Sequence, residues 1–199
     1  MKRLHIESNS PNFIGVWNIS NDNLCDNLIK FFEKNIHLQK QGRVGGGINL
    51  NIKKTYDIPV DPINLESENY KIFKEYISEL FKCYNDYKLQ WPFLSKFKTV
   101  DIPSFNLQRY LSGDHFSGIH TERSTTQNMH RIFAWMTYLN DVQDQANGCT
   151  NFTHYNLKIK PEKGKTLIWP AEWTHAHAGE ILNEGKKYII TGWICFPFN

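Results

Sequence analysis

Four residues in the second half of the sequence have the types and order needed to bind a metal ion and an anion. His120 and Glu122 stand two positions apart, His177 follows much later, and Lys187 lies ten positions beyond His177. Two imidazoles and one carboxylate can bind Fe(II) on one face and leave the opposite positions open. A lysine is a suitable partner for an acidic small molecule, because a carboxylate that leaves water needs a charged donor. The sequence therefore predicts a metal site with an anion-binding group nearby.

The spacing of His120 and Glu122 indicates a metal site only when the surrounding sequence is considered as well. With 8 histidines and 20 acidic residues in 199 positions, chance gives about one His-x-acid triplet. A second one occurs, His5-Ile6-Glu7, and we assign it no role because chain termini are commonly frayed. In an extended segment, residues i and i+2 project from the same face, so both side chains can reach one ion. The third ligand must come from another segment.

His175 and His177 both compete for the place of third ligand. A His-x-His pair followed by glutamate after three or four intervening residues would be typical of a cupin metal site, but Ile181 and Leu182 occupy those positions. We therefore favour His177 and interpret His175 as a packing residue. A lone histidine is more often a packing or surface residue than a ligand. The same interpretation applies to His115, His130 and His154.

Helices in the first half and strands in the second must position these residues. Apolar residues at helical spacing predict one helix from a Ser20 or Asn21 cap to about Asn35 and a longer one from Ser67 to about Tyr87. From Phe105 onward, short segments rich in aromatic and β-branched residues alternate with turn signals. Strands without intervening helices indicate an antiparallel sandwich or jelly roll. The predicted strands are Phe105 to Leu111, Ile132 to Leu139, Asn156 to Ile159, Thr166 to Trp169 and Tyr188 to Phe196.

A glycine-rich segment, Gln41 to Lys54, separates the two predicted helices and contains Gly45-Gly46-Gly47. It is not a phosphate-binding loop, because no Gly-Lys-Ser/Thr follows at the required spacing. Consecutive glycines lower the cost of unusual backbone angles, so we interpret the segment as a mobile loop or hairpin tip. If it has a function, we expect it to be a lid over the site.

The composition excludes several classes of protein. The net charge of +3 comes from scattered lysines, which does not indicate a nucleic-acid partner. No apolar run approaches the ~20 residues that span a bilayer, and the first residues lack the apolar region of a signal peptide. The four cysteines are widely separated, which indicates reduced thiols. We expect a soluble, cytoplasmic protein with neither nucleic acid nor membrane as a partner.

The segment from Gln108 to Trp193 resembles the iron(II)- and 2-oxoglutarate-dependent oxygenases of the prolyl 4-hydroxylase type. Several spacings agree with that family at once, such as Tyr110 ten positions before His120 and Trp193 six positions after Lys187. The resemblance implies a mainly β fold with flanking N-terminal helices and a double-stranded β-helix core, which is a cupin-like jelly roll. It implies one oxygenase domain over residues 1–199, with helical support over about 1–100 and the catalytic core over about 101–199. The motifs that carry it are QRYLSGDHFSGIHTE, RIFAWMTYLNDV, NGCTNF, KPEKGKTLIWP and HAGEILNEGKKYIITGW.

The resemblance also implies a role for individual residues. Lys187 would pair with the distal carboxylate of 2-oxoglutarate, and the hydroxyls of Tyr110 and Tyr138 would donate hydrogen bonds to it. Thr150 matches the threonine of the family's Gly-Gly-x-Thr segment. Without a bound dianion Lys187 would be an expensive buried charge, so we expect it to lie in a wet cleft. The implied ligands of Fe(II) are His120, Glu122 and His177.

Arg131 and Trp193 complete the implied site. Arg131 precedes Tyr138 by seven positions and is a candidate for holding a substrate carbonyl, while Trp193 would line the pocket or pack in the core. Two departures from the family pattern stand out. Glu122 replaces the usual aspartate and adds a methylene group, and Asn147-Gly148-Cys149 replaces Gly-Gly-Glu, which we expect to affect a turn rather than chemistry.

The implied activity is that of a dioxygenase, which uses Fe(II), O2 and 2-oxoglutarate, with ascorbate as a further cofactor, to hydroxylate a C–H bond. The implied substrate is a prolyl residue in a protein or peptide, and a free amino acid or another small molecule is the alternative. A non-catalytic jelly-roll binding module is a third reading, but it predicts loss of Lys187, Tyr110 and Arg131, which are all present. We expect the choice of substrate to depend on the segments Gln41 to Lys54 and Arg123 to His130.

Overall fold

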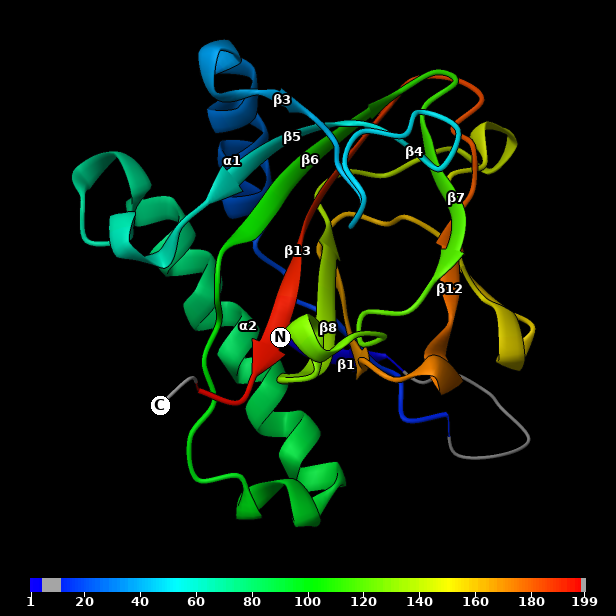
Figure 1. Cartoon of the computed structure of the whole chain (residues 1–199). Coiled ribbons are helices and arrows are strands. Elements are labelled where there is room, and N and C mark those ends of the chain that lie inside the picture. Colours follow the sequence, from blue (N-terminus) through cyan, green and yellow to red (C-terminus); the bar gives the residue numbers. More distant parts are fainter. Residues whose placement is uncertain (5–11, 198–199) are drawn as a thin grey trace.

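A computed structural model describes residues 1–4 and 12–197 of the chain. Two antiparallel sheets face each other, and α1 (Asp22–Lys34) and α2 (Lys71–Gln90) lie on the outer face of the larger sheet (Figure 1). This arrangement confirms the predicted mainly β fold with a jelly-roll core and flanking helices. The second His-x-acid triplet, His5 to Glu7, lies outside the described residues.

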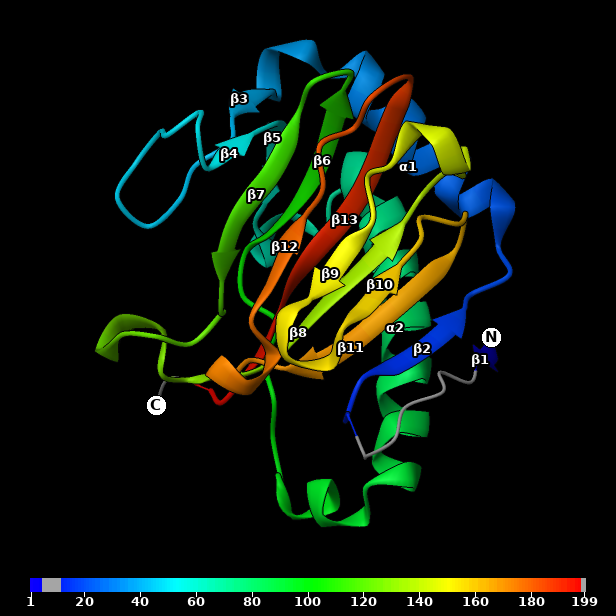
Figure 2. The same cartoon turned by 90° about the vertical axis from the view of Figure 1, so that its right-hand side faces the viewer.

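The chain passes back and forth between the two sheets from residue 105 onward, which is the winding of a double-stranded β-helix (Figure 2). The larger sheet has the order β1 (Lys2–Leu4), β2 (Gly15–Asn18), β11 (Lys165–Pro170), β8 (Arg131–Tyr138), β13 (Lys186–Cys195), β6 (Phe105–Leu111), β5 (Tyr56–Val60) and β3 (Lys40–Gln41). The smaller sheet has the order β10 (Leu157–Ile159), β9 (Thr150–Phe152), β12 (His177–Gly179), β7 (His115–His120) and β4 (Lys53–Lys54).

Short 3-10 helices occupy many of the connections. They are η1 (Ile36–Leu38), η2 (Pro62–Asn64), η3 (Glu68–Tyr70), η4 (Pro92–Lys96), η5 (Thr126–Asn128), η6 (Asp144–Ala146), η7 (Thr153–Tyr155) and η8 (Trp173–His175).

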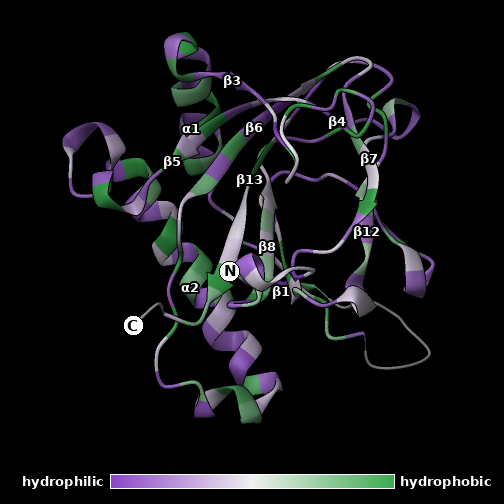
Figure 3. Cartoon of the chain, viewed as in Figure 1, coloured by the Kyte–Doolittle hydropathy of each residue, from purple (hydrophilic) through white to green (hydrophobic). Residues whose placement is uncertain are grey.

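The larger sheet is apolar on both faces because both are covered. Along β8, Phe133 and Trp135 pack against the helices, while Ala134 and Met136 point into the space between the sheets. Both helices carry hydrophilic as well as hydrophobic residues (Figure 3), as helices with one buried face do. The helices therefore cover the outer face of this sheet, and its inner face carries the groups that project into the space between the two sheets.

Local signals predicted several boundaries well. Asn21 caps α1, since its side chain accepts a hydrogen bond from the Leu24 amide at 3.1 Å, and β6 has the bounds predicted for it. Within the glycine-rich segment, Val44 and Gly47 exchange two backbone hydrogen bonds of 2.9 and 2.8 Å. This confirms a hairpin-like turn, while its mobility and its role as a lid remain predictions.

The expected division of the chain implied helical support over the first hundred residues, but these residues also form strands. They contribute β1 to β5, and β4 joins the smaller sheet beside β7. These strands have only two to five residues each, so they show little of the alternation that predicts a strand.

The structure also shows the state of the cysteines and the character of the helices. All four cysteines, Cys25, Cys83, Cys149 and Cys195, are free thiols. Among the described residues, no helix has both the length and the apolar character that a membrane crossing requires.

Candidate metal centre

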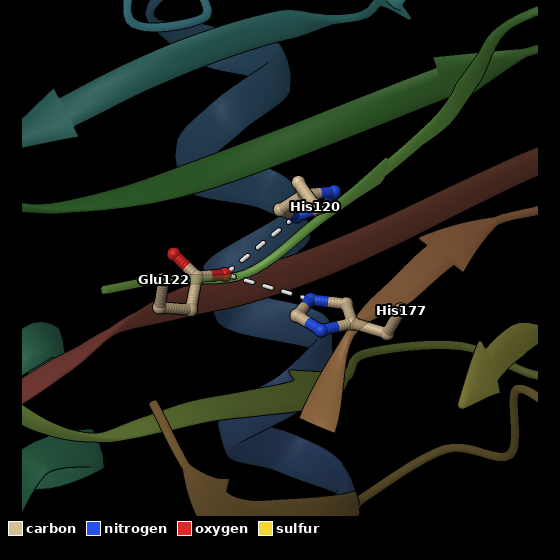
Figure 4. A group of neighbouring side chains, drawn as sticks. All are labelled: His120, Glu122 and His177. Carbon is tan, nitrogen blue, oxygen red and sulfur yellow. Dashed lines mark ion pairs between the residues drawn. The ribbon is translucent and has the colours of Figure 1, made fainter. Parts of the chain in front are cut away.

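Three side chains meet where β7 ends and β12 begins. The antiparallel register pairs His120 directly with His177, and Glu122 follows β7 two residues later. The Glu122 Oε1 atom lies 3.6 Å from His120 Nε2 and 3.5 Å from His177 Nε2 (Figure 4). One donor atom from each residue falls within 4.8 Å of the others. Donors bonded to one ion at about 2.1 Å have separations of this order.

Backbone carbonyls orient both imidazoles. His120 Nδ1 lies 2.8 Å from the Gly118 carbonyl oxygen, and His177 Nδ1 lies 2.9 Å from that of His175. A carbonyl can only accept a hydrogen bond, so Nδ1 carries the proton in each ring. Each Nε2 then presents a lone pair toward Glu122, which is the arrangement seen in metal-binding histidines.

The charge of Glu122 completes a set of donors that fits a cation. Burial raises the pKa of this carboxyl, but hydrogen bonds and charge from His120 and His177, when they carry a proton at Nε2, outweigh that effect and hold its pKa well below the usual range. With those protons absent, an ionised oxygen and two imidazole lone pairs aimed at one point would repel one another unless a positive charge lay between them. Two nitrogens and one oxygen suit a divalent transition metal, Fe(II) included.

Aromatic rings surround the two histidines. Phe116 stacks on His120 with ring centres 3.9 Å apart, and Phe152 and Trp169 lie 5.5 and 5.1 Å from His177. Such a shell limits the access of water to the centre and favours electrostatic interactions there.

Lys187 lies on β13 and is buried in the interior. It shares a face of the larger sheet with Tyr110 and Tyr138, the tyrosines predicted from sequence to bind the co-substrate. Its Nζ donates a hydrogen bond to the Gly148 carbonyl at 2.8 Å and lies 4.3 Å from the centre of the Tyr110 ring. The side chain is only 3% exposed, so the expected wet cleft is wrong for this residue. Burial lowers the pKa of Lys187 to about 8.

Residues 105–195 match the family model described as the 2OG-Fe(II) oxygenase superfamily. These residues belong to that superfamily. The family and the His-Glu-His triad together imply Fe(II) and 2-oxoglutarate as cofactor and co-substrate. The chain matches no curated protein sequence.

Several solved structures with the same fold are described as prolyl hydroxylases. A viral collagen prolyl hydroxylase from Paramecium bursaria Chlorella virus-1, in complex with 2-oxoglutarate, is 17% identical, with a TM-score of 0.67 over 92% of this chain and 95% of that one. A Pseudomonas putida prolyl-4-hydroxylase is 15% identical, with a TM-score of 0.73 over 92% and 93%. A Trichoplax adhaerens prolyl hydroxylase with a peptide of hypoxia inducible factor is 14% identical, with a TM-score of 0.72 over 93% and 84%.

Tyr110 and Tyr138, the two tyrosines predicted to bind the co-substrate, direct their hydroxyl protons to protein acceptors. The side-chain amide of Gln108 donates to Asp57 Oδ2 at 3.2 Å, so its oxygen faces Tyr110 and accepts the Tyr110 hydroxyl at 3.0 Å. The Tyr138 hydroxyl donates to the Ile159 carbonyl at 3.2 Å and lies 2.6 Å from the Thr150 hydroxyl. Lys187, by contrast, has N–H bonds beyond the one that it donates to Gly148. Donation by the tyrosines to 2-oxoglutarate remains a prediction.

The Asn147-Gly148-Cys149 segment lies in the connection between η6 and β9, where Asn147 forms an isolated β-bridge with Leu182. Asn147 and Gly148 have φ values of 60° and 86°, a region that glycine enters without strain. The Gly148 carbonyl accepts a hydrogen bond from Lys187, and Cys149 is half-buried beside it. The expected effect on a turn rather than on chemistry remains a prediction.

Arg131 and Trp193 contact the candidate metal ligand Glu122, which the sequence did not predict. The Trp193 Nε1–H donates to Glu122 Oε2 at 2.6 Å, and one Arg131 nitrogen donates to the Glu122 carbonyl at 2.9 Å. The histidines interpreted as packing or surface residues lie elsewhere. His175 is buried, and its Nε2 bonds to the Asn12 carbonyl at 2.7 Å.

A buried ion pair inside the barrel also escaped sequence analysis. Lys53 of β4 donates to Asp57 of β5 at 2.7 Å, and both side chains are almost fully buried. Thr55 and Gln108 donate further hydrogen bonds to the same carboxylate. The pair joins the edge of the smaller sheet to the larger one. Its residues fall in the glycine-rich segment and just beyond it, where no periodic pattern marked them as interior.

Removing the cation of this pair is expected to destabilise the fold. Lys53→Met leaves the Asp57 carboxylate buried without its charged partner, which costs about 3–5 kcal/mol of unfolding free energy in urea titrations. Adding Asp57→Asn should recover part of this loss, because the unpaired charge is gone. As a control, Lys71→Met breaks an exposed pair with Glu68 and should change stability by less than about 1 kcal/mol. Equal effects of the two lysine substitutions would contradict this account.

Proposed function

We propose that this protein is an Fe(II)- and 2-oxoglutarate-dependent dioxygenase that hydroxylates a prolyl residue in a protein or peptide, and that residues 1–199 form one oxygenase domain. The observation that carries the proposal is the convergence of two imidazole nitrogens and one carboxylate oxygen within 4.8 Å inside a jelly roll of this superfamily. A centre with three protein ligands leaves coordination positions for a co-substrate and O2.

The proposed roles follow from where the side chains lie. His120, Glu122 and His177 bind the iron through the three atoms that face one another. When bound, the iron and 2-oxoglutarate together activate O2, with succinate and CO2 as co-products. Lys187 holds the distal carboxylate of 2-oxoglutarate, because it is a buried cation with hydrogen-bonding capacity beyond its one bond to Gly148.

The aromatic shell and the pocket wall have supporting roles. Phe116 and Trp169 keep water from the ligands, which favours coupling of co-substrate turnover to hydroxylation. Tyr138 and Thr150 form a fixed hydrogen-bonded pair in the interior, and we propose that they line the 2-oxoglutarate pocket with Tyr110.

Two of the similar structures support a peptide substrate. The viral enzyme is described as a collagen prolyl hydroxylase, and the Trichoplax enzyme was solved with a peptide fragment. Identities of 14–17% make these likenesses of fold, so the prolyl substrate is the part of the proposal that most needs a direct assay.

A peptide screen tests this proposal. The protein with Fe(II), 2-oxoglutarate and O2 is incubated with a library of proline-containing peptides, and mass spectrometry detects a gain of one oxygen. We expect hydroxylated peptide and succinate in equal amounts, with the oxygen on proline. Lys186→Met, which changes an exposed neighbour of Lys187, serves as the active control. Succinate formation stimulated only by a free amino acid, with every peptide unmodified, would overturn the prolyl assignment.

Binding of 2-oxoglutarate is expected to weaken as the pH rises. Lys187 must be protonated to pair with a carboxylate, and burial lowers its pKa to about 8 before the co-substrate binds. The dissociation constant should be flat below this pH and rise above it by up to roughly tenfold per pH unit. Titration calorimetry on Mn(II)-loaded protein measures it. Lys187→Arg should abolish the slope, because arginine stays protonated. A constant affinity between about pH 7 and 9.5 would contradict the role of Lys187.

A further inference from the structure

The two oxygens of Glu122 have different surroundings. Oε1 faces the imidazoles of His120 and His177 at 3.6 and 3.5 Å. Oε2 accepts a hydrogen bond of 2.6 Å from the indole nitrogen of Trp193, and a guanidinium nitrogen of Arg131 lies 3.7 Å away. One oxygen is therefore directed to the metal position and the other is held by the protein.

Arg131 contacts both Glu122 and Trp193. Its NH1 group donates to the backbone carbonyl of Glu122 at 2.9 Å, and its guanidinium lies 3.6 Å from the centre of the Trp193 ring. Such a stacked cation fixes the plane of the indole. Glu122 follows β7 of the smaller sheet, whereas Arg131 begins β8 and Trp193 lies on β13. Glu122 is therefore anchored to two strands of the larger sheet.

A glutamate ligand needs such support more than an aspartate does. The additional methylene group adds a rotatable bond, whose freedom is lost when the side chain is ordered. A free carboxylate can also bind a metal through both oxygens. A second oxygen on the iron would occupy a position that the co-substrate or O2 requires.

We propose that Trp193 and Arg131 are positioning residues that hold Glu122 as a ligand through one oxygen only. The inference rests on the proposed function, since it assumes that Glu122 binds iron. It gives both residues a role toward the ligand in place of the substrate-binding role that the family resemblance implies for Arg131. The long carboxylate, its indole donor and the stacked guanidinium form one unit that keeps the remaining face of the metal open.

Metal affinity in a double-mutant cycle tests the inference without relying on catalysis. Trp193→Phe keeps the ring beneath Arg131 and removes the N–H donor. In the Glu122 background it should raise the dissociation constant for Mn(II) about tenfold to a hundredfold, as loss of a hydrogen bond to a ligand commonly does. In a Glu122→Asp background the shorter side chain cannot span Trp193 and the metal together, so the same substitution should change affinity less than about twofold.

A second tryptophan provides the matched control. The indole N–H of Trp135 has no hydrogen-bond partner among the described residues, and the ring packs on the helix side of the sheet. Trp135→Phe should therefore leave Mn(II) affinity unchanged even if it lowers thermal stability. Arg131→Gln should weaken Mn(II) binding as Trp193→Phe does, because it removes the bond to the Glu122 backbone and the stacked cation.

The outcomes separate this inference from the proposed function. If Trp193→Phe lowers Mn(II) affinity equally with Glu122 present and in the Glu122→Asp background, or lowers it in neither, the positioning role is overturned while metal binding by the unaltered protein stands. Failure of the unaltered protein to bind Mn(II) would overturn both.

Discussion

Replacing His177 with alanine is expected to weaken Fe(II) binding more than a hundredfold. The structure brings its Nε2 within 3.5 Å of Glu122 and pairs it in register with His120, so the substitution removes one of three ligands. Loss of a group that merely orients a ligand commonly costs ten- to a hundredfold in affinity, and loss of the ligand itself should cost more. Equilibrium dialysis with Fe(II) under anaerobic conditions measures the effect.

His175 provides the control because it is the nearest histidine in sequence that could take the same role. It is buried, its Nε2 lies 2.7 Å from the Asn12 carbonyl, and its Nδ1 lies 2.9 Å from the Thr174 hydroxyl. His175→Ala should lower stability by about 1–3 kcal/mol, as loss of a buried hydrogen-bonded group does, and leave iron affinity within a few-fold of the original. Iron binding that survives His177→Ala and is lost in His175→Ala would reassign the ligand.

Replacing Lys187 with methionine is expected to abolish productive binding of 2-oxoglutarate while iron affinity changes little. Methionine has nearly the same length and shape but no charge, so under the proposed function the distal carboxylate would lose its buried cationic partner. Truncating one partner of a desolvated charge pair costs about 2–5 kcal/mol, or roughly 30-fold to several thousand-fold in dissociation constant. Titration calorimetry on Mn(II)-loaded protein measures this change.

The neighbouring lysine offers a matched comparison. Lys186 precedes Lys187 on β13 and is exposed, so Lys186→Met should leave 2-oxoglutarate affinity as it is. Equal affinities of the two variants would remove Lys187 from the pocket.

Features that depend on local sequence were predicted best. The cap at Asn21, the presence of the two helices and the bounds of β6 follow from spacing within one segment. The His120 and Glu122 pair also follows from local geometry, because alternate residues of an extended chain share a face.

Features that depend on pairing between distant segments could not be predicted from the residues alone. The register that places His177 opposite His120, and the approach of Trp193 to Glu122, join strands far apart in the chain. The Lys53 and Asp57 pair lies on the short strands β4 and β5, where too few residues alternate to mark an interior face.

The burial of Lys187 shows where an energetic expectation failed. Desolvation was expected to keep this lysine in contact with water, yet the Gly148 carbonyl and the face of Tyr110 compensate part of that cost in the interior. The lowered pKa of Lys187 reflects the part of the desolvation cost that these contacts do not offset.

The visible charge-transfer absorption of the anaerobic complex tests the central claim most directly. Fe(II) is added to the folded protein with saturating 2-oxoglutarate, and the spectrum is recorded before and after O2 is admitted. Our account predicts a band that saturates at one iron for each chain, is absent in His177→Ala, and decays with O2 as succinate forms. A folded protein that shows no band and forms no succinate above the blank would contradict it.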